Sequence, residues 1–80
     1  MDDAEVIRRI GALVDEEHTL ERTLGTTGPD DESTDRLREI EVALDQCWDL
    51  LRQRRARREM GDDPDDAQVR PTQIVEGYQQ

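Results

Sequence analysis

The pairing in this sequence that has the spacing of a metal site is Asp15 with His18. A carboxylate and an imidazole at i and i+3 on a helix are ligands that helical bundles use to hold di-metal centres. A dimer could bring two such pairs together, with Glu41 or Asp45 within reach. The chain has a single histidine, however, and acidic residues are so frequent that one would lie near any histidine by chance. We therefore expect a solvated or salt-bridged His18 and no metal or other cofactor.

The densest run of charge is a group of five arginines, Arg52, Arg54, Arg55, Arg57 and Arg58. Five cations in seven residues could bind RNA, DNA or an acidic protein surface. No aromatic residue interleaves with them to stack on bases, and Glu59 and four aspartates between residues 62 and 66 follow and cancel the charge. The pattern favours structural charge balance, with a protein partner as the next interpretation and nucleic acid as the last.

No catalytic constellation accompanies these residues. Cys47 falls on an apolar helix face with no histidine near it, which indicates a small buried hydrophobe and not a nucleophile. Trp48 is the largest apolar group and is expected to be a core or interface residue and a contact hot spot. We predict a non-enzymatic protein-interaction or adaptor module. Its candidate interaction residues are Trp48, Arg54, Arg55, Arg58 and Tyr78.

Two amphipathic stretches must position these side chains. In the stretch from residue 37 to 59, apolar residues step by three and four, and the heptad continues onto arginines: Leu37, Ile40, Leu44, Cys47, Leu51, Arg54 and Arg58. An earlier stripe has the same spacing and is interrupted by a glutamate: Val6, Ile10, Leu13, Glu17, Leu20 and Leu24. This spacing predicts two helices, each with one apolar seam.

The ends of both helices carry capping signals. We expect helix one over residues 3–24, with Asp2 or Asp3 as its N-cap, and helix two over residues 34–60, ended by Gly61. The glycines and proline between residues 25 and 29 predict a turn over residues 25–33. Helix two begins at Pro29 or is capped by Ser33 or Thr34.

The turn predicts an all-α fold in which residues 1–61 form an antiparallel, coiled-coil-like hairpin. Counting outward from the turn sets Leu24 near Leu37, Leu13 near Trp48 and Ile10 near Leu51. It also sets the acidic N-terminus (Asp2, Asp3 and Glu5) beside Arg55, Arg57 and Arg58. Residues 62–80 are expected to form an acidic linker and an extended tail.

The composition limits how much apolar surface this fold can bury. Of 80 residues, 32% are hydrophobic and 40% are charged, so one small domain without a large core is expected. Two helices bury one face each and leave apolar side chains partly wet. We therefore predict a homodimer, in which two hairpins form a four-helix bundle about a two-fold axis.

The net charge and the single cysteine limit which partners and which cellular compartment we expect. A net charge of −10 makes the chain as a whole repel nucleic acid and anionic membranes. No apolar stretch approaches the ~20 residues of a membrane span, and one cysteine fits a reducing compartment. We expect a cytoplasmic protein that binds itself or another protein, with nucleic acid disfavoured and no membrane partner.

Three stretches of the chain resemble a known family. LVDEEHTL at 13–20, LREIEVALDQCWDLLRQRRARRE at 37–59 and VRPTQIVEGY at 69–78 are similar to small actinobacterial proteins of domain of unknown function 2630. The stretch DQCWDLLRQRRA is the most specific part. The resemblance brings no activity, ligand or partner, and no functional residue is carried over from it. It does imply that the VRP and VEGY segments belong to the protein's design and that the tail docks.

Overall fold

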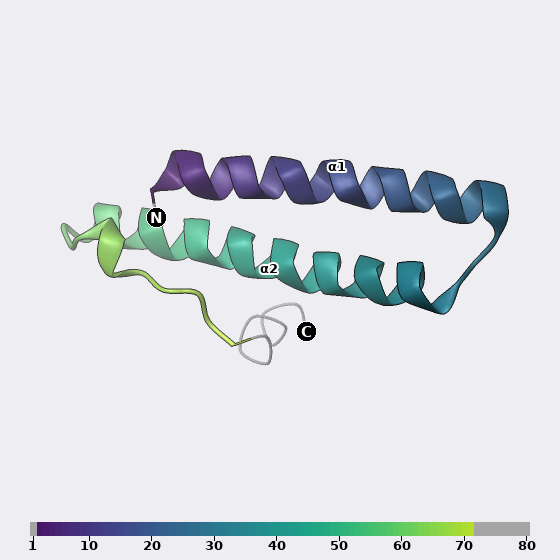
Figure 1. Cartoon of the computed structure of the whole chain (residues 1–80). Coiled ribbons are helices and arrows are strands. Elements are labelled where there is room, and N and C mark those ends of the chain that lie inside the picture. Colours follow the sequence, from purple (N-terminus) through teal and green to yellow (C-terminus); the bar gives the residue numbers. More distant parts are fainter. Residues whose placement is uncertain (1, 72–80) are drawn as a thin grey trace.

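Two long antiparallel helices form a hairpin. They are α1 (Asp3–Thr27) and α2 (Asp31–Glu59), and a short 3-10 turn, η1 (Pro64–Asp66), follows them. The computed structural model describes residues 2–71, a range that contains no strand. Figure 1 shows α1 and α2 side by side, with the chain after η1 turning back along α2. The predicted all-α hairpin is confirmed.

Helix α1 begins at the predicted cap but ends later than predicted. Asp2 forms a capping box: its carboxylate accepts the Glu5 N–H at 2.8 Å, and the Glu5 carboxylate accepts the Asp2 N–H at 3.5 Å. Gly25 does not end the helix, because glycine inside a helix costs only about 1 kcal/mol relative to alanine. The helix ends instead at Gly28, whose φ of 85° suits a residue without a Cβ.

Helix α2 begins at Asp31, three residues before the predicted start. Asp30 is the N-cap, and its carboxylate accepts the Ser33 N–H at 2.8 Å. This hydrogen bond lowers the pKa of Asp30. Neither Pro29 nor Ser33 nor Thr34 starts the helix, and the connection is therefore only residues 28–30, not the predicted 25–33. An N-cap carboxylate stabilises the start of a helix because it accepts a hydrogen bond from one of the free N–H groups of the first turn.

The other end of α2 is close to the prediction. The helix ends at Glu59, and Gly61 has a φ of 81°. The Asp62 N–H donates to the Arg57 carbonyl at 2.7 Å, and the Gly61 N–H donates to the Arg58 carbonyl at 3.2 Å. These two bonds form a Schellman motif, which satisfies the last free carbonyls of a helix and requires a left-handed residue at the glycine position.

The core is small and lies between the two helices. Val6, Ile10 and Leu50 form a buried cluster, and Leu13 and Ile40 are buried as well. The partly buried side chains that pack against the cluster are Val14, Leu44, Cys47, Leu51 and Ala67. Because Ala67 follows η1, the chain beyond α2 contributes to the core.

The predicted alignment of the helices is wrong near the loop. Arg36 donates to both carboxylate oxygens of Glu16, at 2.6 and 2.8 Å. The predicted alignment would have put Arg36 opposite Gly25, nine residues and about 13 Å from Glu16 along the helix. The three-residue connection is shorter than the predicted turn and joins the helices in a different register. At the open end of the hairpin, Arg58 does pair with Asp3 as predicted, at 2.9 Å.

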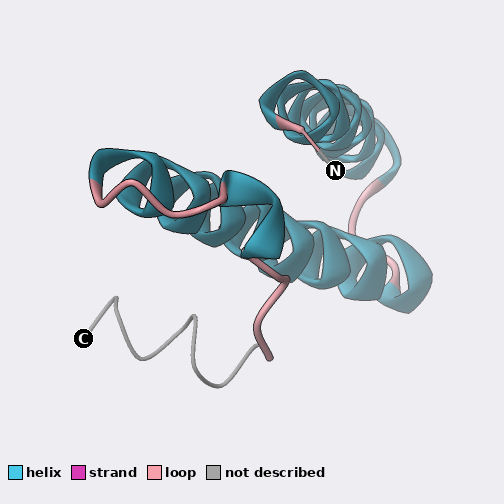
Figure 2. Cartoon of the chain, turned by 90° about the vertical axis from the view of Figure 1, so that its left-hand side faces the viewer, coloured by secondary structure: helices cyan, strands magenta, loops and turns pink. Residues whose placement is uncertain are grey.

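The chain after α2 folds back as a strap, by which we mean residues 62–71. Figures 1 and 2 both show α2 lying between α1 and this strap.

Neither long helix in the described range carries the apolar stretch that a bilayer crossing requires.

Removal of one core side chain tests this packing. Leu13→Ala should lower the free energy of unfolding by about 2–5 kcal/mol, because Leu13 is 2% exposed and its deletion leaves a cavity. Met60→Ala is the matched control, since Met60 is an exposed large apolar residue, and should change stability by less than about 0.5 kcal/mol. Urea unfolding followed by circular dichroism measures both, and equal effects would contradict the assignment of the core.

Candidate functional site

The two residues that have the spacing of a metal site, Asp15 and His18, do not belong to a group of metal ligands within residues 2–71. Asp15 and His18 are both exposed on α1. Across residues 2–71, no three histidine, cysteine, aspartate or glutamate side chains are grouped so that they could hold an ion. The structure therefore adds no support to the carboxylate–histidine hypothesis.

The arginine run is largely occupied by acidic partners from the same chain. Arg54 is 5% exposed. Its Nε donates to Asp3 at 2.5 Å, and its Nη1 donates to Asp65 at 3.0 Å and to the Pro64 carbonyl at 3.2 Å. The hydrogen bonds from Arg54 and Arg58 lower the pKa of Asp3, and the hydrogen bond to Asp3 is the main reason that the pKa of Arg54 is raised.

Two of the other four arginines, Arg55 and Arg58, are also paired. Arg58 Nη2 lies 2.9 Å from Asp3 Oδ2. Arg55 Nε lies 3.4 Å from Glu59 Oε1, in an exposed i,i+4 pair. Arg54 was a candidate interaction residue, but its guanidinium is buried and serves the fold. The pairing of Arg54 and Arg58 with Asp3 fits charge balance at these two positions, because a phosphate backbone is bound by arginines that are free to neutralise it.

A second polar cluster, absent from the sequence interpretation, fastens the strap to α2. Asp49 is 1% exposed. Its carboxylate accepts from the Arg70 Nε at 2.9 Å and from the Arg70 Nη2, and from the Gln53 Nε2 at 2.9 Å. Gln53 also donates to the Gln68 carbonyl at 2.8 Å, and Gln46 donates to the Arg70 carbonyl at 3.2 Å. The tail therefore docks, at least as far as residue 71.

The electrostatics of this cluster follow from its geometry. The hydrogen bonds from Arg70 are the largest cause of a lowered pKa for Asp49, and they outweigh the opposing effect of burial. A buried carboxylate is tolerated when a cation and further donors satisfy it. Asp49 is therefore a structural anion and is poorly placed to act as a free base.

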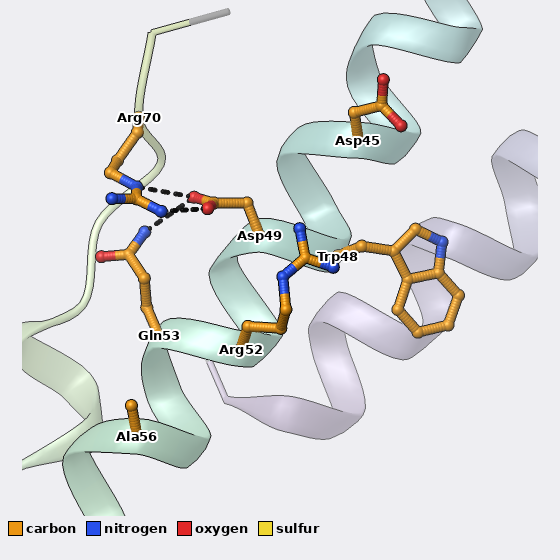
Figure 3. Close-up of a pocket in the computed structure, with 7 residues that line it drawn as sticks. All are labelled: Asp45, Trp48, Asp49, Arg52, Gln53, Ala56 and Arg70. Carbon is orange, nitrogen blue, oxygen red and sulfur yellow. Dashed lines mark hydrogen bonds and ion pairs between the residues drawn. The ribbon is translucent and has the colours of Figure 1, made fainter. Parts of the chain in front are cut away.

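An open groove lies between α2 and the strap. It has a volume of about 630 Å³ and is lined by Asp45, Trp48, Asp49, Arg52, Gln53, Ala56 and Arg70. Figure 3 shows Arg70 and Gln53 converging on Asp49 at one side of the groove, while Trp48 and Arg52 stand on the other. The groove thus joins an apolar ring, two cations and two carboxylates on the outer side of α2.

Trp48 stands at the rim of the core and is 48% exposed. Its neighbour Cys47 packs against the core cluster, and burial raises the pKa of the Cys47 thiol. That fits the expected small hydrophobe, because a thiol is nucleophilic only as the thiolate.

Ile7 lies on the same side of the hairpin as Trp48. Each follows a core residue by one position (Val6 and Cys47), a rotation of about 100° in the same sense. In two antiparallel helices, side chains that are rotated by the same angle from the core-facing residue, each about its own helix axis, lie on the same side of the hairpin. Ile7 is 57% exposed. We call this side the Trp48 face; it comprises Ile7, Val14, Leu44, Trp48 and Leu51.

The remaining candidate, Tyr78, lies outside the described residues.

The sequence interpretation missed Asp49, Gln53 and Arg70. The one local signal was the i,i+4 pair of Asp49 and Gln53 on α2, since such pairs are neighbours on a helix. Nothing periodic links either of them to Arg70.

Comparison with known proteins places this helical hairpin in a family. The family model described as "Protein of unknown function (DUF2630)" matches residues 2–80, and the chain belongs to this family, as its sequence had suggested. It is 52% identical over 77 residues to uncharacterized protein Rv0898c of Mycobacterium tuberculosis (strain ATCC 25618 / H37Rv) and to uncharacterized protein Mb0922c of Mycobacterium bovis. Each match covers 95% of this chain and 88% of the relative. No solved structure matches the chain.

The pKa of Asp49 gives a pH-dependent test of the strap. Asp49→Asn should lower the free energy of unfolding by about 1–3 kcal/mol at pH 7, because Arg70 loses a charged acceptor. The carboxylate pKa is below its ordinary value of 3.8 in the folded chain, so the stabilisation is present above about pH 4 and is lost as pH falls through the folded value. Guanidinium unfolding at pH 7, 4 and 3 should show the two proteins converging. A constant difference would contradict the pairing.

The strap should loosen without unfolding the hairpin when Arg70 is removed. We expect Arg70→Gln to speed amide exchange at Asp66 and Ala67 by about tenfold or more, because these N–H groups bond only to carbonyls within η1 and its cap. Arg38→Gln is the control, since Arg38 forms only an exposed pair with Asp35. Hydrogen exchange followed by NMR measures both, and unchanged exchange in Arg70→Gln would show that the cluster does not hold the strap.

Proposed function

We propose that this chain is a non-enzymatic protein-interaction module that acts in the cytoplasm and binds through the Trp48 face. The observation that carries the proposal is the exposure of Trp48, a large aromatic side chain left 48% exposed beside a small core. Tryptophan is enriched among the residues that dominate binding energy in protein interfaces. An indole at the rim of a hairpin is therefore a suitable anchor for a partner.

The surroundings of Trp48 support binding to a protein surface. Ile7 extends the apolar area across to α1, while Arg52 and Asp45 border it on α2. An apolar centre with a charged rim is the usual anatomy of a protein interface. By contrast, the buried charges of Asp49 and Arg54 are satisfied within the chain, which supports a structural and not a chemical role for them.

Affinity purification of the tagged full-length chain from its native host tests the proposal. Proteins recovered with the wild type should fall by about tenfold or more with Trp48→Ala, because hot-spot residues contribute about 2 kcal/mol or more. Met60→Ala, which removes another exposed large apolar side chain, should leave recovery unchanged. Circular dichroism verifies that both variants keep their helices. Equal recovery with Trp48→Ala and wild type would contradict the proposal.

A further inference from the structure

A second pattern runs along α2 beside its core-facing residues. Spaced four, three, four and three apart, its members are Glu41, Asp45, Trp48, Arg52 and Arg55, which we call the charge stripe. Heptad spacing places them on one side of the helix. Two acids precede the tryptophan and two bases follow it, so the stripe is negative at one end, aromatic in the middle and positive at the other end.

The fold leaves most of this charge unused. Glu41, Asp45 and Arg52 form no ion pair or hydrogen bond with any residue from 2 to 71. Arg52 acts on Asp49 only through its longer-range charge. Arg55 has one contact, to Glu59 at 3.4 Å, in which both side chains are exposed, and such pairs contribute little. These charges are therefore free to meet charges of another molecule.

The order of the charges makes the stripe complementary to itself in one orientation. If two α2 helices lie antiparallel with Trp48 opposite the partner's Trp48, Arg55 lies opposite the partner's Glu41. Arg52 then lies one residue from the partner's Asp45. A two-fold axis repeats each of these contacts. A parallel arrangement would instead set like charges against each other along the whole stripe, which is unfavourable.

The groove beside the stripe has a suitable shape for such a neighbour. It is concave, it holds about 630 Å³, and Asp45, Trp48 and Arg52 belong both to its lining and to the stripe. Ala56 supplies a small side chain at its far end, so an approaching helix is not obstructed there (Figure 3). An indole from a second molecule would lose water contact against this lining, which is the driving force for aromatic anchors.

We infer that a second copy of this chain docks antiparallel along the charge stripe of α2, at the edge of the Trp48 face, with the two Trp48 side chains at the two-fold axis. Arg52 pairs with the partner's Asp45, and Arg55 pairs with the partner's Glu41. The inference rests on the proposed function, because it names the partner that the exposed Trp48 side chain anchors. It also gives an orientation to the homodimer that the partly wet apolar faces predict.

Complementary charge reversals test this geometry. Asp45→Arg leaves only cations next to Trp48, and Arg52→Asp leaves only anions, so each variant should repel its own copies and raise the dimer Kd by about tenfold or more. Mixed in equal amounts, the two variants present opposite charges at both symmetry-related contacts. The mixture should form a heterodimer with a Kd within about threefold of the wild type.

Sedimentation equilibrium of the full-length chain measures these constants. Because the net charge of −10 opposes association at long range, the experiment is run at about 0.15 M salt, where the Debye length is about 8 Å. Arg8→Asp is the control variant. Arg8 is exposed, lies about 200° around α1 from Val6, and should leave the Kd within about threefold of the wild type.

The outcomes separate this inference from the proposed function. If the wild type stays monomeric at about 0.5 mM, its dimer Kd is higher than that of most specific complexes. That result overturns the second copy as the occupant. If Trp48→Ala still abolishes recovery of another protein in that case, the proposed function stands and its partner is heterologous. A wild-type dimer that neither single reversal weakens, or whose reversals fail to rescue each other on mixing, overturns the antiparallel contact.

Discussion

The architecture depends on one buried cation at the open end of the hairpin. Arg54 continues the stripe that α2 uses to face α1, but where an apolar side chain would be expected it carries a guanidinium. Its stem packs as a hydrocarbon, while its head binds Asp3 at the start of α1 and Asp65 in η1. A buried charge that loses its partners is strongly unfavourable. Arg54 therefore requires three segments of the chain to meet in one arrangement.

Asp49 is likewise a buried charge that another segment of the chain neutralises, but it is an anion where Arg54 is a cation. A carboxylate on the outer side of α2 is covered by Arg70 from the strap, and Gln53 satisfies the same oxygen. A chain with 32% hydrophobic residues has few apolar side chains to spare for docking a tail. It uses directional contacts between buried charges in their place, which contribute more to a defined position than to stability.

The sequence predicted what depends on local spacing. Heptads located both helices, and the capping aspartates at residues 2 and 3 and the glycine at residue 61 located two of their ends. The alignment near the loop could not be predicted, because it depends on Asp30 being chosen as a cap over Pro29, Ser33 and Thr34, which are similarly suited. The docking of the strap on α2 could not be predicted from the sequence either. Asp49 and Arg70 are 21 residues apart, and nothing in one marks the other as its counter-ion.

The half-exposed indole has one more consequence. The chain contains a single tryptophan, and it stands at the rim of the groove and not inside the core. Its intrinsic fluorescence therefore comes from one known place. Emission from an indole shifts to shorter wavelength when water is excluded from it, so the protein carries a built-in optical reporter of whether this face is covered, with no added dye.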